Sequence, residues 1–135
     1  MEIQQKLSKK IHIILWVAQI VLAVLLISGT VMKFLPIEKI SAMMPWTGQV
    51  PVLFVRFLGL IDLAGATGLI LPALLRIKPQ LTSWAAVGII ALMICAIVFH
   101  ISRGETSVIG MNVFTILVAL FIAWGRFKKV PVNSK

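Results

Sequence analysis

The sequence predicts an all-α fold, a bundle of four membrane-spanning helices with a partly apolar loop between the first two. Hydrophobic residues make up 60% of its 135 residues and charged residues 13%, whereas about a quarter of an average soluble domain is charged. The apolar residues are gathered into four long runs separated by proline, glycine and basic residues. So little polar surface suits a lipid solvent, and we expect one membrane domain over residues 1–135.

The four runs predict helices at about residues 11–35, 52–75, 81–101 and 107–124. Each has close to the ~20 apolar residues that a helix needs to cross a bilayer. The first run follows lysines, as in a signal peptide, but its apolar core is longer than about 15 residues and no small-residue cleavage site closes it. We therefore expect the first helix to be retained.

The loop between the first two helices is delimited by Pro36 and Pro51 and is itself half apolar. Ile37, Ile40 and Met43 recur at helical spacing, which predicts a short helix lying in the outer membrane interface. Such a helix would cover the bundle as a lid, or would rest on the helix ends as an ordinary connection. The pattern leaves both interpretations open.

Basic residues are distributed unevenly between the two ends of the expected bundle. Nine lie on the side of the termini, namely Lys6, Lys9, Lys10, Arg76, Lys78, Arg126, Lys128, Lys129 and Lys135. The positive-inside rule then places both termini in the cytoplasm, as short tails, and the longer loop outside. The formal net charge of +9 does not predict a nucleic-acid partner, because the cations flank apolar runs instead of forming a basic face.

Six polar or charged side chains lie within the apolar runs, at their ends or just beyond them, all in the half of the bilayer opposite the termini. They are Lys33, Arg56, Asp62, His100, Arg103 and Asn112. Asp62 lies about ten residues, or ~15 Å, into the second helix, near the bilayer midplane. A charged side chain there costs at least about 2.5–3.5 kcal/mol, so we expect these residues to share one pocket that opens outward.

The helix faces agree with such a pocket, because polar and small residues form one stripe on each of three helices at a spacing of about 3.6 residues. The stripes are Gln19, Ala23, Leu26, Thr30 and Lys33; then Arg56, Gly59, Asp62 and Gly65; then Asn112, Thr115, Ala119 and Ala123. Small residues let membrane helices approach closely, so we expect the stripes to face inward. Gln19 is expected to be structural, and Asn112 to join helices by hydrogen bonding.

Asp62 requires a partner from another helix. Arg56 lies about 120° around the same helix and ~9 Å along it, and its side chain leans toward the N-terminus, away from Asp62. Lys33, Arg103 or protonated His100 is therefore the expected partner. The pair would either hold helices together, as buried opposite charges often do, or form part of a ligand or proton site.

Motifs of catalysis and metal binding are missing from the sequence. There is no Walker A loop, no GxSxG, no HExxH and no cluster with metal-ligand spacing. Cys95 is the single cysteine, and its apolar surroundings favour a buried, inert thiol. We expect no catalytic residue, no metal and no enzymatic activity of the chain on its own.

Three stretches in order resemble one family. "SGTVMKFLP" closes the first helix, "GLIDLAGATGLILP" fills the second, and "FHISRGE" ends the third before a helix that bears an asparagine. This order resembles the DoxX-like family of small bacterial four-helix membrane proteins, over about residues 11–127. The resemblance implies a multi-pass protein of the bacterial inner membrane. The family is named after a membrane subunit associated with thiosulfate:quinone oxidoreduction, and it often has Glu where this chain has Asp62.

The functional expectation is a membrane protein whose pocket binds a small amphipathic or anionic ligand, a quinone or a lipid headgroup, or which serves as a membrane subunit of a redox partner. The excess of cations among the six residues favours an anion. Two alternatives remain open. One is a small proton-coupled transporter or exporter, assembled from several copies, with Asp62 as the titrating group. The other is a quinone-linked oxidoreductase subunit.

Overall fold

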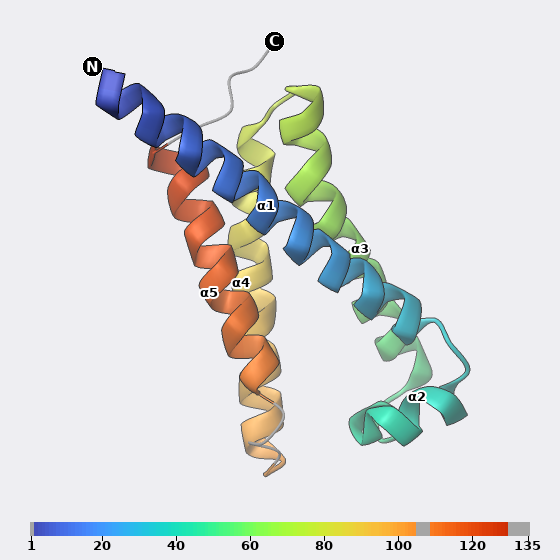
Figure 1. The fold of residues 1–135 in the computed structure, drawn as a ribbon. Coiled ribbons are helices and arrows are strands. Elements are labelled where there is room, and N and C mark those ends of the chain that lie inside the picture. The colour runs from blue at the N-terminus through green and yellow to red at the C-terminus, as the bar shows by residue number, and fades with distance from the viewer. Residues whose placement is uncertain (1, 105–108, 130–135) are drawn as a thin grey trace.

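The structure, a computed structural model, describes residues 2–104 and 109–129. Its elements are α1 (Glu2–Lys33), α2 (Ile37–Met43), the 3₁₀ turn η1 (Pro45–Gly48), α3 (Val52–Leu75), α4 (Gln80–Ser102), α5 (Gly110–Trp124) and the π-helical turn η3 (Gly125–Lys129). Within these residues four helices, α1, α3, α4 and α5 with its extension, are long and apolar enough to cross a membrane. The predicted all-α fold with four spans is confirmed (Figure 1).

Two helices differ in extent from the apolar runs that predict them. α1 begins at Glu2 instead of near Ile11, because the lysine-rich segment before the run lacks proline and glycine and consists largely of good helix formers. Its 32 residues span ~48 Å at 1.5 Å per residue, more than the ~30 Å hydrocarbon core. α5 continues beyond Trp124 as η3, while the expected start of this helix at residue 107 lies outside the described residues.

The long helices form two antiparallel pairs, α1 with α3 and α4 with α5, which meet along α3 and α4 (Figure 1). One end of the molecule carries the N-terminus, the connection between α3 and α4, and η3, and is called the terminal end below. The opposite end carries α2 and is called the α2 end. The short helix α2 confirms the helical periodicity of the loop after Pro36.

The core lies where the two pairs meet and draws residues from all the long helices. Its buried members are Leu22, Ala23, Leu26, Ala66, Leu69, Ala86, Ile89, Ala119, Ile122 and Ala123. The expected inward stripes are confirmed, since Gln19 and Leu26 of α1, Asp62 of α3 and Thr115 of α5 are all buried. Five of the ten are alanines, which suits a bundle in lipid, where close van der Waals packing replaces the hydrophobic effect as the main attraction between helices.

Glycines set the closest approaches between helices. A Cβ atom at Gly59 of α3 would lie 2.8 Å from the Phe34 ring, and one at Gly68 would lie 2.8 Å from Ala85 Cβ of α4. At the terminal end, the Leu15 side chain fills the space beside Gly125, where a Cβ atom would lie 2.6 Å from it. The pairs are thus locked together toward the terminal end. Toward the α2 end they diverge (Figure 1).

The contact of Gly68 with Ala85 yields a stability prediction. In Gly68→Ala the new methyl group meets the Cβ atom of Ala85, which moves only if α4 moves, so overpacking is expected to cost about 1–3 kcal/mol. Gly88→Ala is the matched control on α4, because no described heavy atom lies within 4 Å of its Cβ position. The control should gain up to about 1 kcal/mol of helix propensity. Thermal unfolding in detergent measures both, and equal stabilisation of the two variants would contradict the close crossing.

Candidate functional site

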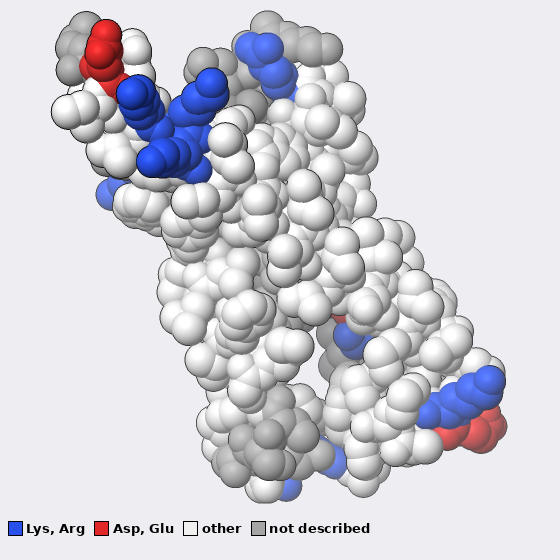
Figure 2. All heavy atoms as spheres, viewed as in Figure 1, with Lys and Arg blue, Asp and Glu red and all other residues white. Residues whose placement is uncertain are grey.

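A pocket of about 520 Å³ lies between the two diverging helix pairs at the α2 end. We call it the main pocket. Each long helix contributes one polar side chain to its wall: Lys33 from α1, Asp62 from α3, His100 from α4 and Asn112 from α5. The rest of the wall is Met43, Met44, Pro45, Trp46, Phe54, Leu58, Leu92, Met93, Cys95, Ala96, Phe99 and Met111. Figure 2 shows the molecule hollowed at this end, with basic and acidic atoms beside the hollow.

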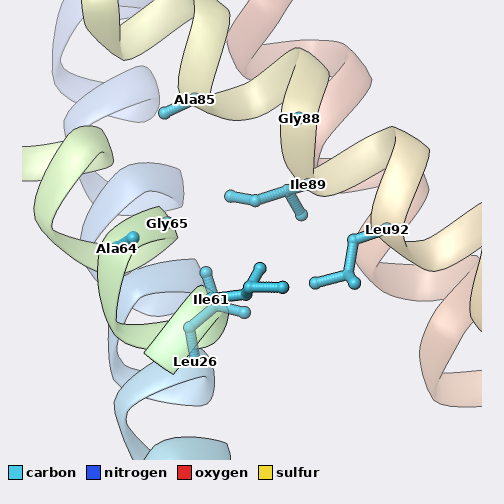
Figure 3. Close-up of a pocket in the computed structure, with 8 residues that line it drawn as sticks. All are labelled: Leu26, Ile61, Ala64, Gly65, Ala85, Gly88, Ile89 and Leu92. Carbon is cyan, nitrogen blue, oxygen red and sulfur yellow. The ribbon is translucent and has the colours of Figure 1, made fainter. Parts of the chain in front are cut away.

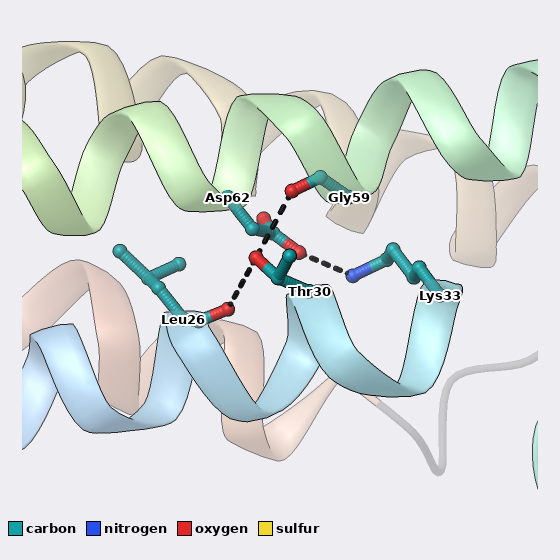
Figure 4. Close-up of polar contacts among 5 residues, drawn as sticks. All are labelled: Leu26, Thr30, Lys33, Gly59 and Asp62. Carbon is teal, nitrogen blue, oxygen red and sulfur yellow. Dashed lines mark hydrogen bonds and ion pairs between the residues drawn. The ribbon is translucent and has the colours of Figure 1, made fainter. Parts of the chain in front are cut away.

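An ion pair joins α1 to α3 at the inner wall of the main pocket. Lys33 Nζ donates to Asp62 Oδ2 over 2.6 Å (Figure 4), so the structure gives Lys33 as the interhelical partner of Asp62. One turn away, Thr30 Oγ1 lies 3.0 Å from the Gly59 carbonyl oxygen and 3.1 Å from that of its own helix at Leu26. The pair therefore sits where the two helices are already held close.

Gly29 provides the space that this ion pair occupies. A Cβ atom at Gly29 would lie 3.0 Å from Asp62 Oδ2 and 3.4 Å from Lys33 Nζ. Any side chain at this position would press on the carboxylate. Gly29 is therefore a site residue that the sequence analysis missed, although it stands in the "SGTVMKFLP" stretch.

Arg56 and Arg103 lie outside the main pocket, unlike the other four candidates. Arg56 Nη1 donates to the carbonyl oxygens of Lys33 and Leu35 over 2.5 and 2.7 Å. These carbonyls close α1 and have no partner within their own helix, so Arg56 caps α1 and turns away from Asp62, as expected. The Arg103 guanidinium lies over the Phe99 ring at 5.2 Å, on the outer side of a residue that lines the pocket.

Asn112 is the polar residue whose surroundings differ most from expectation. Its Nδ2 atom is buried and has no hydrogen-bond acceptor among the described residues, so this amide nitrogen does not join two helices. A buried donor without an acceptor costs about 1–3 kcal/mol. The amide is instead placed on the wall of the main pocket.

The loop after α1 forms one side of the main pocket. Met43, Met44, Pro45 and Trp46 contribute to the wall, and Trp46 reaches across to α4. Its ring meets the Phe99 and His100 rings edge to face at 5.8 and 6.1 Å between centroids. The loop thus bridges the two helix pairs, in the position expected of a lid.

A second polar cluster lies at the terminal end and was not expected. Arg126, assigned from the sequence to the C-terminal tail, is 4% exposed, because α5 continues as η3 and carries it inward. Its Nε donates to Gln19 Oε1 over 2.7 Å, and its Nη1 lies 3.0 Å from His12 Nδ1. Gln19 Nε2 in turn donates to the Leu69 carbonyl oxygen over 2.7 Å. The cluster ties α1, α3 and η3 together, which gives Gln19 the structural role expected of it.

Cys95 also departs from expectation. The thiol is exposed instead of buried, because α4 turns this face toward the main pocket that Cys95 helps to line. Within the described residues no group of His, Cys, Asp and Glu is arranged to hold a metal ion.

The ion pair yields a second prediction. Asp62→Asn leaves the Lys33 ammonium in a largely buried position without its carboxylate, which is expected to cost about 3–5 kcal/mol. The double variant Asp62→Asn with Lys33→Met removes both charges and should recover most of the loss in thermal stability. Lys39→Met, at an exposed position, is the control for removing a cation. A single variant as stable as the wild type would show that the pair does not hold α1 to α3.

The family comparison extends over most of this architecture. The family model of the DoxX-like family matches residues 17–123, from the middle of α1 to the end of α5. The matched range includes each polar residue of the main pocket. No curated protein and no solved structure gives a match. Four apolar helices and this match make the chain an integral membrane protein, as the sequence predicts. The chain belongs to the DoxX-like family.

Proposed function

We propose that the main pocket binds a neutral, ring-headed amphipathic ligand of the quinone class, which the protein holds alone or as the membrane subunit of a redox partner. The observation that carries the proposal is the buried Asn112 amide nitrogen, which has no acceptor among the described residues and lines a pocket of about 520 Å³. If the Asn112 amide turns toward the pocket, a carbonyl oxygen on a bound ring would accept its hydrogen bond and offset the desolvation cost. The volume is within the usual range for small-molecule sites.

The charges around the main pocket favour a neutral ligand over an anion. Lys33 is neutralised by Asp62 at 2.6 Å, and the Arg56 guanidinium is bound to carbonyl oxygens at the end of α1. The excess of cations in the sequence is therefore not presented to the pocket as a net positive wall. A phosphate headgroup would require such a wall, whereas the carbonyl groups of a quinone require hydrogen-bond donors only.

The apolar part of the wall suits a flat ring. Trp46 and Phe99 both line the pocket and contact each other edge to face, and aromatic rings favour offset or edge contacts with a further ring. The four methionines Met43, Met44, Met93 and Met111 have flexible, polarisable side chains that adapt to irregular shapes. These groups provide contact area, while Asn112 and Lys33 provide directional hydrogen bonds.

Binding is tested with a variant that keeps Trp46 as the sole tryptophan, with phenylalanine at positions 16, 84 and 124. A short-tailed benzoquinone should quench Trp46 fluorescence in a saturable way, because Trp46 lines the pocket. Asn112→Leu in this background should weaken binding about tenfold, since one buried hydrogen bond is lost. Thr67→Val removes an exposed hydroxyl group outside the pocket and should leave binding unchanged. Linear quenching that Asn112→Leu does not alter would contradict the proposal.

The proposal also places the protein in the bacterial inner membrane with both termini in the cytoplasm. Exposed cations gather at the terminal end, among them Lys6, Lys9, Lys10, Arg76, Lys78 and Lys128, and Figure 2 shows blue atoms clustered there. Cytoplasmic loops and tails carry such an excess of Lys and Arg. The main pocket would then open toward the periplasmic half of the bilayer.

Topology is tested with reporter fusions after Lys135 and within the loop at residues 41–49. The C-terminal fusion should report the cytoplasm and the loop fusion the periplasm, because the positive-inside rule acts on the lysines near α1. A variant with Lys6, Lys9 and Lys10 replaced by glutamine should reduce this asymmetry. Reports of the same compartment from both wild-type fusions would overturn the orientation.

A further inference from the structure

A second cavity, of about 260 Å³, lies between α3 and α4 next to the main pocket. We call it the apolar groove. Its wall consists of Leu26, Ile61, Ala64, Gly65, Ala85, Gly88, Ile89 and Leu92, and Figure 3 shows these residues arranged around the space between the two helices. No polar side chain contributes to it, so the groove has nothing to offer a polar group.

The packing of small residues explains why the apolar groove exists. α3 and α4 touch where Gly68 meets Ala85 and separate from there toward the α2 end. Beyond this contact the wall includes Ala64 and Gly88, which have little or no side chain, while Ile89 reaches from α4 toward Gly65 (Figure 3). No described heavy atom lies within 4 Å of the Cβ position of Gly88. Ala64 and Gly88 are both exposed, so the groove is open along its side.

The apolar groove adjoins the main pocket. Leu92 lines both cavities, and Ile61 of the groove is followed directly by Asp62 of the pocket. Along α4 the groove runs from Leu92 back to Ala85, a distance of ~10 Å at 1.5 Å per residue. The Leu92 side chain therefore lies at the boundary of the two cavities, and a molecule that occupies both must pass this side chain.

We propose that the apolar groove holds the hydrocarbon tail of the ligand whose ring lies in the main pocket. The inference rests on the proposed function and narrows it: the ligand is a lipid quinone with a linear apolar tail, and the tail contributes to recognition. In a bilayer the tail already has an apolar environment, so the gain comes from close packing against the groove and not from leaving water. Gly88 and Ala64 determine specificity because their small size keeps the groove open.

The test compares two quinones with the same ring, one carrying a methyl group and the other a decyl tail. Affinities are measured in lipid nanodiscs by Trp46 quenching, in the single-tryptophan background, and are expressed as mole fractions of the lipid so that partitioning cancels. In the wild-type groove the decyl compound should bind about fivefold more tightly, from the dispersion contacts that its tail gains.

Gly88→Leu should abolish this preference, because the added side chain fills the apolar groove without meeting described atoms near its Cβ position. The affinity for the methyl compound should stay unchanged. Ala64→Leu obstructs the facing wall and serves as the second variant. Ala91→Leu is the matched control, since Ala91 is an exposed residue of α4 outside both cavities, and it should keep the preference for the decyl tail.

The outcomes separate the two proposals. If neither quinone binds the wild-type protein, the quinone function fails and the tail inference fails with it. If both quinones bind with equal affinity, or if Gly88→Leu and Ala64→Leu keep the preference for the decyl tail, the inference about the apolar groove is overturned while the main pocket stands. A preference for the decyl tail that Gly88→Leu and Ala64→Leu both keep would leave membrane acyl chains as the occupants of the groove.

Discussion

The ion pair between Lys33 and Asp62 is the constraint on which the architecture of the α2 end depends. A carboxylate near the middle of a bilayer requires a partner, and the partner lies on the neighbouring helix at 2.6 Å. Gly29 must then remain without a side chain, because a Cβ atom there would lie 3.0 Å from the carboxylate oxygen. Arg56 completes the arrangement by binding the carbonyl oxygens at the end of α1, which fixes the backbone that carries Lys33.

Packing differs between the two ends of the molecule, and this difference creates the site. At the terminal end the pairs interlock: Leu15 fills the space beside Gly125, and Arg126 reaches Gln19 on α1. At the α2 end the pairs diverge, and among the described residues the loop with Trp46 bridges them. The polar side chains of the main pocket therefore stand on opposite sides of a gap, with Lys33 and Asp62 on one pair and His100 and Asn112 on the other.

Much of this could be predicted from the sequence because the bilayer imposes strong rules. The length of each apolar run predicts a membrane-spanning helix. The free-energy cost of a charge inside the membrane predicts that Asp62 meets a cation from another helix. The 3.6-residue stripes correctly predict the inward faces. The same stripe on α5, from Thr115 through Ala119, reaches Arg126 seven residues further on, yet the position of this cation near the chain end favours a tail residue. Only the continuation of the helix as η3 shows that this residue is buried.

Other features depended on tertiary geometry that no spacing rule supplies. Periodicity places Arg56 on the polar stripe, but whether it faces a pocket or caps α1 depends on how the chain leaves Lys33. Similarly, an apolar run predicts a buried Cys95, whereas the divergence of the pairs exposes it. The composition gives the number of cations but not the groups that neutralise them, so the excess of basic residues alone favours an anionic ligand. The ion pair and the α1 cap remove that excess from the pocket wall.

The spacing of the two helix pairs connects the packing of the bundle to its chemistry. In the proposed binding mode, a ring in the main pocket reaches Asn112 on α5 and rests beside the Lys33–Asp62 pair on α1 and α3. The width of that gap is governed by the crossing of α3 and α4, which is closest where Gly68 meets Ala85. A methyl group added at this crossing is expected to push α3 and α4 apart, and the resulting separation of the two pairs increases toward the α2 end. A hydrogen bond weakens steeply as its geometry departs from ideal. Under the proposed function, small residues far from the polar groups would therefore influence the affinity of the pocket as well as the stability of the bundle.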